Sequence, residues 1–360
     1  MQAIRNIIKY LAALVLYYSG ALALFDWLSR KFGARSNYII LMYHRVLEDI
    51  NAENVFTQPG MSVSSEAFDH QLEYLKSKYR VIDLEQLVQT FSDDRRASRP
   101  MAVITFDDGW RDNYSNAFPL LKKHNLPARI FVTTDYINTN RPFWFLMVKW
   151  ILTESQMTAD MLTGVVADLA EDFPSESEDL AELVHVIKTA GVDSDKIIQA
   201  CKKLEHATLE RLIEQMLART RLSPDYWERD RPMLTWEQAR CMSRQGIGIE
   251  SHGCSHRILT LLPSAEICRE ITASKTAIES ELGGTVSCFA YPNGNYDEEV
   301  KSAVEQAGYS CAVTTAGEKK NSGKSDKYAL RRVAVHDGVS APPLGRFSKA
   351  MFAWHLIRHA

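Results

Sequence analysis

The sequence alternates between short apolar runs and amphipathic segments, and this alternation restricts the possible folds more than any other feature. Residues 101–106 (MAVITF) and 128–134 (ARIFVTT) have the composition of buried strands, and a predicted helix, NAFPLLKKHN, lies between them. The alternation resumes with strands predicted at 246–251 and 286–292, each followed by a helical segment. Strands that are separated by helices indicate βα units and a parallel sheet.

The chain is long enough for one α/β barrel with an insertion. Its 360 residues exceed one average domain, but they fit a barrel of this kind. Residues 140–232 are charged, helical in period and without strand signals, so we expect a helical insertion between barrel units. The net charge of −3 and the lack of a basic stripe or a phosphate-binding glycine loop argue against nucleic acid as a partner.

The N-terminal segment, residues 1–35, is expected to be distinct from the main domain at 36–360. It is strongly apolar from Tyr10 to Phe25, which is slightly short of the roughly 20 residues that a spanning helix needs. No small-x-small cleavage site is evident. Three interpretations are open: a helix on a membrane surface, a short span, or a helix packed on the domain's own core. The first two would give membrane contact through residues 1–30.

Two adjacent aspartates follow the strand predicted at 101–106, in the sequence ITFDDGW. A strand directs successive side chains to opposite faces, so Asp107 and Asp108 must lie just beyond its end, where Gly109 opens a turn. In parallel α/β folds, functional residues gather where strands end. His44 also follows a predicted strand, at 37–43.

A second pair of polar residues follows the strand at 246–251, in the sequence SHGCSH. His252 and His256 are four residues apart, so both imidazoles could face one point. With one carboxylate they would form the donor set of a catalytic zinc site that keeps open positions. A second carboxylate beside the ligand could accept a proton from water. The two aspartates are therefore predicted to divide the tasks of metal ligand and base.

The motifs TFDDG, SHGCSH and FAYPNG, in this order, resemble those of the NodB-homology polysaccharide deacetylases, carbohydrate esterase family 4. The resemblance covers roughly residues 38–348, apart from the helical insertion. The stretches LMYHRV, SKTAIESELG and YALRRVAV resemble the branch that is associated with exopolysaccharide synthesis. The resemblance implies a distorted (β/α) barrel with fewer than eight strands and a metal-dependent amide hydrolase of acetylated amino sugars.

The resemblance also implies roles for the motif residues. Asp107 would be the general base, and Asp108, His252 and His256 would bind a divalent metal. Zinc is the expected metal, with cobalt, nickel and manganese as alternatives. The backbone N–H near Tyr291 would stabilise the oxyanion together with the metal.

Three further residues are expected to bind substrate. Trp110 could stack on a sugar ring or belong to the core, and Pro292 and Asn293 follow the strand of the third motif.

Two departures from the family pattern affect the expected chemistry. The third motif usually has an arginine two residues before its proline, and this arginine orients the base; the place is taken by Ala290 here. The tuning of Asp107 must then come from elsewhere or be lost. The second departure is that no clear leucine-to-histidine fifth motif is evident near the C-terminus, so the identity of the general acid is undecided. His44 resembles the acid of exopolysaccharide deacetylases with a rearranged strand order and is favoured, and His336 is the competitor.

The expected function is removal of N-acetyl groups from an acetylated polysaccharide or from its lipid-linked glycolipid precursor. The alternatives are a non-catalytic carbohydrate-binding relative and a metal-dependent amidase with a small non-sugar substrate. We expect a bacterial-type, membrane-associated protein. Its six scattered cysteines favour the cytoplasmic side, whereas the family's polymer-modifying members favour the periplasmic side.

Overall fold

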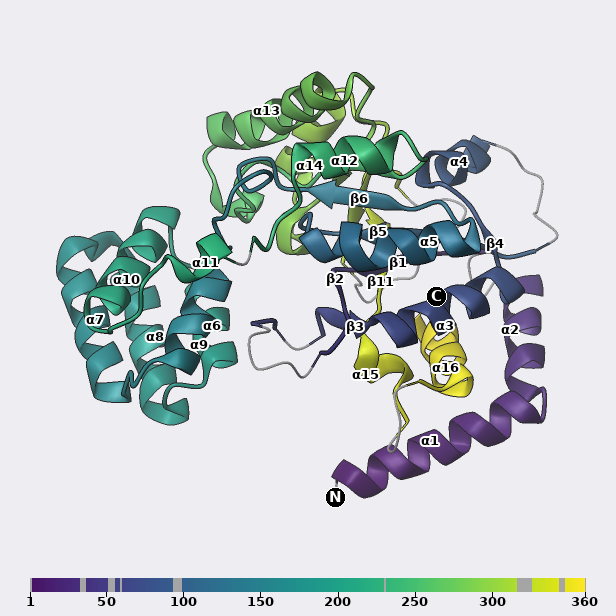
Figure 1. Ribbon diagram of the computed structural model, residues 1–360, viewed down its shortest axis with the longest axis horizontal. Helices are drawn as coiled ribbons and strands as arrows, with labels where there is room; N and C mark the ends of the chain where they lie inside the picture. Colours follow the sequence, from purple (N-terminus) through teal and green to yellow (C-terminus); the bar gives the residue numbers. More distant parts are fainter. Residues whose placement is uncertain are drawn as a thin grey trace. The chain divides into compact units, whose positions relative to one another are not determined.

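The computed structural model divides the chain into two compact units (Figure 1). The described residues are 2–32, 37–50, 56–58, 60–92, 99–229, 231–315, 326–342 and 347–359. The first unit, here called the barrel unit, comprises Met1–Asn51, Gly60–Asn138 and Leu234–Ala360. The second, here called the helical unit, comprises Ala52–Pro59 and Thr139–Met233.

The barrel unit is built on one parallel sheet with the strand order β10-β9-β8-β7-β6-β5-β1-β11, and β4 pairs with β5. Its strands are β1 (Tyr38–Tyr43), β4 (Arg80–Val81), β5 (Met101–Phe106), β6 (Arg129–Val132), β7 (Gly248–Ser251), β8 (Cys288–Ala290), β9 (Cys311–Thr314), β10 (Leu330–Arg331) and β11 (Val333–Ala334). A separate parallel pair is formed by β2 (Arg45–Leu47) and β3 (Ser62–Ser64).

One short segment closes this sheet almost completely into a barrel. Strand β10 pairs with β9, and strand β11 pairs with β1, where Leu41 lies opposite Val333. Only Arg332 separates the two strands, so both edges of the sheet bond to the same stretch of chain. The predicted (β/α) barrel is confirmed.

Helices surround the sheet of the barrel unit (Figure 1). They are α1 (Gln2–Tyr18), α2 (Ala21–Lys31), α3 (Ser65–Lys78), α4 (Leu84–Gln89), α5 (Phe118–His124), α12 (Trp236–Ser243), α13 (Ser264–Leu282), α14 (Glu298–Gln306), α15 (Asp337–Ser340) and α16 (Lys349–His359). Local sequence sets several of their ends. Asp297 caps α14 by accepting the backbone N–H of Val300, and Gly283 ends α13 with a φ of 70°.

The central strands are buried on both faces, which explains their continuous apolar sequences. Ile39 and Leu41 of β1 belong to a large core that includes residues of the surrounding helices. Tyr38 and Ile40, on the opposite face, join Val103 and other strand residues in a second core. Side chains from many strands therefore fill the barrel, and polar groups are confined to its ends.

In the described part of the chain, a membrane-crossing length of apolar helix is found only when two helices are combined. No single helix meets the requirement, whereas Arg5–Tyr18 and Ala21–Lys31 meet it together by length and composition, with a bend of 74° between them.

The helical unit contains α6 (Trp144–Glu154), α7 (Ala159–Asp172), α8 (Ser177–Ala190), α9 (Ser194–Cys201), α10 (His206–Ala218) and α11 (Tyr226–Arg229). The unit has its own aromatic core, in which Trp150 stacks on Tyr226 with ring centroids 5.4 Å apart. Among its described residues no strand is present, in keeping with the helical period of residues 140–232.

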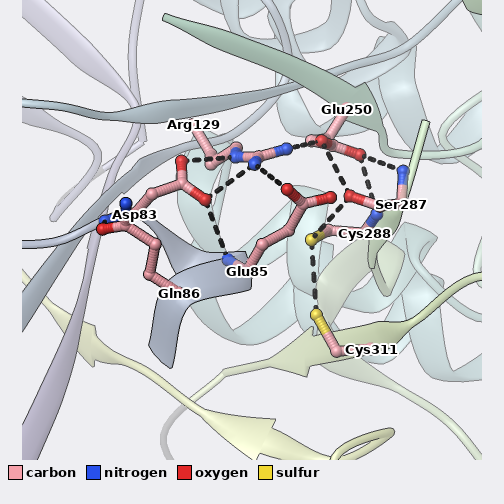
Figure 2. Close-up of polar contacts among 8 residues, drawn as sticks. All are labelled: Asp83, Glu85, Gln86, Arg129, Glu250, Ser287, Cys288 and Cys311. Carbon is pink, nitrogen blue, oxygen red and sulfur yellow. Dashed lines mark hydrogen bonds and ion pairs between the residues drawn. The ribbon is translucent and has the colours of Figure 1, made fainter. Parts of the chain in front are cut away.

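A buried ion network joins the strands of the barrel unit near the point where β6, β8 and β9 begin (Figure 2). Arg129 opens β6, and its guanidinium lies between three carboxylates (Figure 2). It is 2.7 Å from Asp83 Oδ1 and 3.1 Å from Glu85 Oε2, and it also pairs with Glu250 of β7. The side chain of Glu250 is only 1% exposed, whereas that of Glu85 is 42% exposed.

Glu250 extends the network to the next two strands (Figure 2). Its Oε2 accepts the backbone N–H groups of Ser287 at 2.9 Å and Cys288 at 2.7 Å. Cys311 of β9 lies opposite, with its Sγ 3.3 Å from that of Cys288. All six cysteines, each in a described part of the chain, are free.

Loss of the Glu250 charge is expected to destabilise the barrel far more than loss of the Glu85 charge. In Glu250→Gln, two backbone donors and Arg129 lose a buried anionic acceptor, which should cost roughly 3 kcal/mol of unfolding free energy. In the matched variant Glu85→Gln the lost pair is half exposed, and the cost should stay below about 1 kcal/mol. Urea unfolding of both variants measures the difference; equal losses would contradict a structural role for the buried pair.

Candidate active site

The sharp turn after β5 places two carboxylates side by side. Asp107 and Asp108 directly follow the strand, and both are buried. Asp108 has a φ of 77°, which is rare for a residue with a side chain, and Gly109 has a φ of 84°. A Cβ on Gly109 would lie 2.9 Å from the side chain of Ile137, so only glycine fits there. Backbone strain at Asp108 is typical of functional positions.

Asp108, His252 and His256 converge on one point. Asp108 Oδ1 lies 3.6 Å from His252 Nε2 and 3.3 Å from His256 Nε2, and one donor atom from each residue falls within 4.8 Å of the others. His252 Nδ1 is 2.7 Å from the carbonyl oxygen of Ala290, which leaves Nε2 directed at the cluster. One carboxylate oxygen and two imidazole nitrogens at this spacing could hold a divalent metal ion.

The charges of these residues suit metal binding. Burial raises the pKa of Asp108, but the hydrogen bond and charge of His256 outweigh it, and the net pKa lies below its usual range. Burial lowers the pKa of His252 to about 4, so its imidazole is neutral near pH 7. An anionic carboxylate and a neutral imidazole are the forms that bind metals.

Asp107 is held by an arginine that sequence reasoning did not identify. Arg332 NH1 lies 2.6 Å from Asp107 Oδ1, and NH2 lies 2.5 Å from Oδ2. The same guanidinium donates to Thr105 Oγ1 and to the carbonyl oxygen of Thr314, both at 3.2 Å. Burial raises the pKa of Asp107, but the charge of Arg332 outweighs it, and the net pKa is lowered. Asp107 is therefore an ionised carboxylate in a fixed orientation.

Of the two candidate acids, the structure brings His44 toward the aspartates. The backbone N–H of Asp107 donates to the carbonyl oxygen of Tyr43, the residue before His44, at 3.0 Å. Burial raises the pKa of both aspartates, and the charge of His44 lowers both, although Arg332 has a larger effect on Asp107 and His256 has a larger effect on Asp108. His336 instead packs beside Gly338, where a Cβ would lie 3.0 Å from its ring.

The family model for polysaccharide deacetylases matches residues 94–312, well over half of the chain, including both aspartates and both histidines of the cluster. The chain belongs to this family.

Curated relatives agree with this assignment. The chain is 24% identical over 315 residues to the Bacillus subtilis (strain 168) protein YxkH, which carries a polysaccharide deacetylase name; the match covers 87% of this chain and 76% of YxkH. It is 29% identical over 182 residues to the poly-β-1,6-N-acetyl-D-glucosamine N-deacetylase of Staphylococcus epidermidis, covering 48% of this chain and 60% of that enzyme.

Two solved structures have the same fold. The Streptococcus pyogenes deacetylase PplD, in complex with acetate, has a TM-score of 0.55 at 17% identity and covers 89% of this chain and 97% of its own. IcaB from Ammonifex degensii has a TM-score of 0.54 at 16% identity and covers 90% of this chain and 97% of its own. The predicted family is thus confirmed by sequence and by fold.

An arginine from another part of the chain takes the place of the one expected in the third motif of a deacetylase of this family. Ala290 offers its carbonyl oxygen to His252, and the guanidinium arrives instead from Arg332. The sequence signal for this was the second arginine of YALRRVAV, which the pattern identified only as part of a strand. An arginine therefore still orients Asp107 and lowers its pKa.

Two expectations for the deacetylase site need correction. Trp110 was a candidate for stacking on sugar, but its ring is fully buried and its Nε1–H donates to Asp108 Oδ2 at 2.8 Å. It therefore orients the carboxylate. The backbone N–H near Tyr291 was expected to stabilise the oxyanion, but the N–H of Tyr291 itself already donates to the carbonyl oxygen of Val313 at 3.1 Å. The Tyr291 ring is also buried.

The other two substrate candidates lie in the turn after β8. Pro292 is buried, whereas Asn293 is exposed, has a φ of 56° and donates from Nδ2 to Asn295 Oδ1 at 2.6 Å. Their contact with substrate stays a prediction.

A second residue missed from the sequence holds the loop of the two histidines. Glu270 of α13 is buried and accepts the backbone N–H groups of Cys254 at 2.7 Å and Ser255 at 3.0 Å. It also accepts the Ser255 hydroxyl at 2.6 Å. Nothing in the local sequence of α13 marks this glutamate, because its partners lie in the preceding loop.

Removal of the Arg332 charge is expected to move the acidic limb of the deacetylase pH profile. In Arg332→Met, burial acts on Asp107 without an opposing guanidinium, so its pKa rises and the carboxylate becomes protonated at higher pH. The acidic limb of kcat/KM should therefore shift to higher pH. Arg332→Lys keeps the charge and should shift less.

The comparison requires that both variants keep the fold, which their urea midpoints report. An acidic limb that stays in place in Arg332→Met would show that Asp107 is not the titrating base.

Proposed function

We propose that the protein is a metal-dependent hydrolase that removes N-acetyl groups from amino sugars of a polysaccharide or its lipid-linked precursor. One observation carries the proposal: a buried carboxylate, Asp107, adjoins a cluster of Asp108, His252 and His256 that suits a divalent metal. The name of the Staphylococcus epidermidis relative, an N-deacetylase of poly-N-acetylglucosamine, supports this class of substrate.

Asp108, His252 and His256 would hold the metal, for which we propose zinc, with cobalt, nickel or manganese as substitutes. A bound divalent cation supplies Lewis acidity toward water and toward the acetyl carbonyl oxygen. The chain keeps these ligands in place through neutral hydrogen-bond partners. Trp110 fixes Oδ2 of Asp108, and the Ala290 carbonyl fixes the ring of His252.

Asp107 would act as the general base. The guanidinium of Arg332 occupies one lone pair on each carboxylate oxygen. Each oxygen of an ionised carboxylate has a further lone pair, so Asp107 can still accept a proton from the attacking water. The pair with Arg332 favours the ionised form before the reaction.

His44 would protonate the departing amine. It follows β1, directly beside the strand that carries the aspartates, and its backbone carbonyl accepts the side chain of Asn113 at 2.7 Å. Histidine has an ordinary pKa near neutrality, which suits an acid that must donate and then recover a proton.

The main reason to consider a non-catalytic carbohydrate-binding relative no longer applies. That alternative depended on the missing arginine of the third motif, and Arg332 supplies an arginine to the same carboxylate. No feature of the described residues favours a small non-sugar substrate.

The function is tested by acetate release from N-acetylglucosamine oligomers. Full-length protein that has been treated with a chelator should lose activity, and added zinc should restore it. Acetate release that survives chelation would exclude metal dependence. Protein that binds zinc but releases no acetate from a panel of acetylated glycans would exclude the deacetylase.

Two variants should separate the base from the metal ligands. Asp107→Asn should lose turnover by about 10²–10⁴-fold and retain zinc, because it removes only the proton acceptor. His252→Ala should lose both turnover and zinc, with affinity reduced more than about 100-fold. Zinc content by elemental analysis provides a readout that is independent of activity. Equal zinc loss in the two variants would refute the division of roles.

His44→Ala should slow deacetylation by about 10²-fold or more, whereas the matched variant His336→Ala should have little effect. The physical reason is that His44 follows the strand beside the one that carries the aspartates, whereas His336 packs beside Gly338. Rates measured with the same oligomer under saturating zinc make the comparison. The opposite order of effects would assign the acid role to His336.

A further inference from the structure

The exposed apolar surface of the protein is concentrated on α1, α2 and the residue that follows α2. Among the described residues, ten of the eleven exposed large apolar side chains lie between positions 7 and 32. They are Ile7, Ile8, Leu11, Val15, Tyr18, Leu24, Phe25, Trp27, Leu28 and Phe32. Single exposed apolar residues need no explanation, but such a concentration marks an interaction site.

The exposed apolar residues of α1 lie on one side of the helix. Ile8, Leu11, Val15 and Tyr18 recur at intervals of three and four residues, which places them along one stripe. Val15 is 67% exposed and Tyr18 is 76% exposed. A stripe of this kind has no role in a helix that only supports the domain's own core.

A different side of α1 is attached to the barrel unit. Ala13 is fully buried and packs with Ala350 and Met351 of α16, beside which α1 runs (Figure 1). Trp354 of α16 packs against the same cluster. The helix therefore has one face on protein and another face open, which is incompatible with complete immersion in lipid.

Helix α2 has the same division. Leu22 is buried in the main core of the barrel unit, and Arg30 pairs with Asp26 at 3.0 Å. Leu24 and Leu28, one turn apart, are 57% and 37% exposed. Helix α2 is thus fixed to the domain by Leu22, and Leu24 and Leu28 face outward.

The charges around these side chains are positive. Residues 5–32 contain the basic residues Arg5, Lys9, Arg30 and Lys31 and a single acid, Asp26, whereas the whole chain has a net charge of −3. Arg5, Lys9 and Lys31 are exposed. Lys31 also lies over the ring of Trp27, with Nζ 4.7 Å from the ring centroid. Apolar and aromatic side chains with basic neighbours match an anionic lipid surface.

We propose that α1 and α2 dock the protein on an anionic phospholipid membrane. The two helices lie in the interface, with their exposed apolar side chains among the upper acyl chains and the basic side chains of Arg5, Lys9 and Lys31 at the headgroups. Their packed faces and the 74° bend between them favour this arrangement over a span. A second copy of the chain would present the same basic excess, which a lipid surface complements.

Cosedimentation of the full-length protein with vesicles tests the proposal. Vesicles of phosphatidylcholine and phosphatidylglycerol should bind it about tenfold or more tightly than vesicles of phosphatidylcholine alone, and added salt should weaken the binding. Alkaline carbonate should release the bound protein, because the helices do not cross the bilayer. Equal binding to both vesicle types, or resistance to carbonate, would overturn the proposal.

Substitutions locate the surface. Leu11→Glu combined with Val15→Glu should abolish binding, and Arg5→Gln combined with Lys9→Gln should reduce the preference for anionic vesicles. The matched control is Leu261→Glu, because Leu261 is 57% exposed but lies outside the two helices; it should bind like the unaltered protein. Binding loss in the control as well would refute the assignment.

Light scattering without lipid tests whether a second copy of the chain, and not a membrane, covers this face. A monomer is expected in all variants. A dimer that Leu11→Glu and Val15→Glu dissociate would show that a second copy covers this face, and it would overturn the proposal. None of these measurements depends on deacetylase activity, so they test the membrane proposal independently of the proposed reaction.

Discussion

The ion pair between Arg332 and Asp107 connects the closure of the barrel with its chemistry. Arg332 is the one residue between the strands that bond to the two edges of the sheet, and its guanidinium contacts both oxygens of Asp107. Both side chains are buried, and neither charge would be stable there without the other. The same residue thus keeps the sheet nearly closed and keeps the carboxylate ionised.

The remainder of the site depends on backbone conformations that the sequence would avoid elsewhere. Asp108 and His256 both have positive φ angles, at a cost of about 1–3 kcal/mol each. Their surroundings offset this cost with specific hydrogen bonds, from Trp110 to Asp108 and from the histidine loop to Glu270. The ion network around Arg129 joins the strands separately, near the point where β6, β8 and β9 begin.

Sequence reasoning succeeded where the signal was local. Apolar runs that are followed by Asp108 and His252 place those residues at strand ends, and a parallel sheet brings strand ends together. Arg332 could not be found in this way, because it lies 225 positions from Asp107 and the expected position holds Ala290. Trp110 was ambiguous for a different reason. The sequence around an aromatic residue beside a motif does not show whether its ring faces the substrate or the core. Only the burial of the ring decides between them.

The two proposals have a common physical consequence. Lipid-linked precursors are confined to a membrane surface, and an enzyme docked on the same surface encounters them at a higher effective concentration than one in solution. The packed faces of α1 and α2 limit how deeply they can insert, because Ala13 and Leu22 cannot leave the protein without unfolding part of its core. Docking of this kind is shallow and depends on charge. Such an enzyme would exchange between membrane sites, so a single molecule could reach many substrate chains.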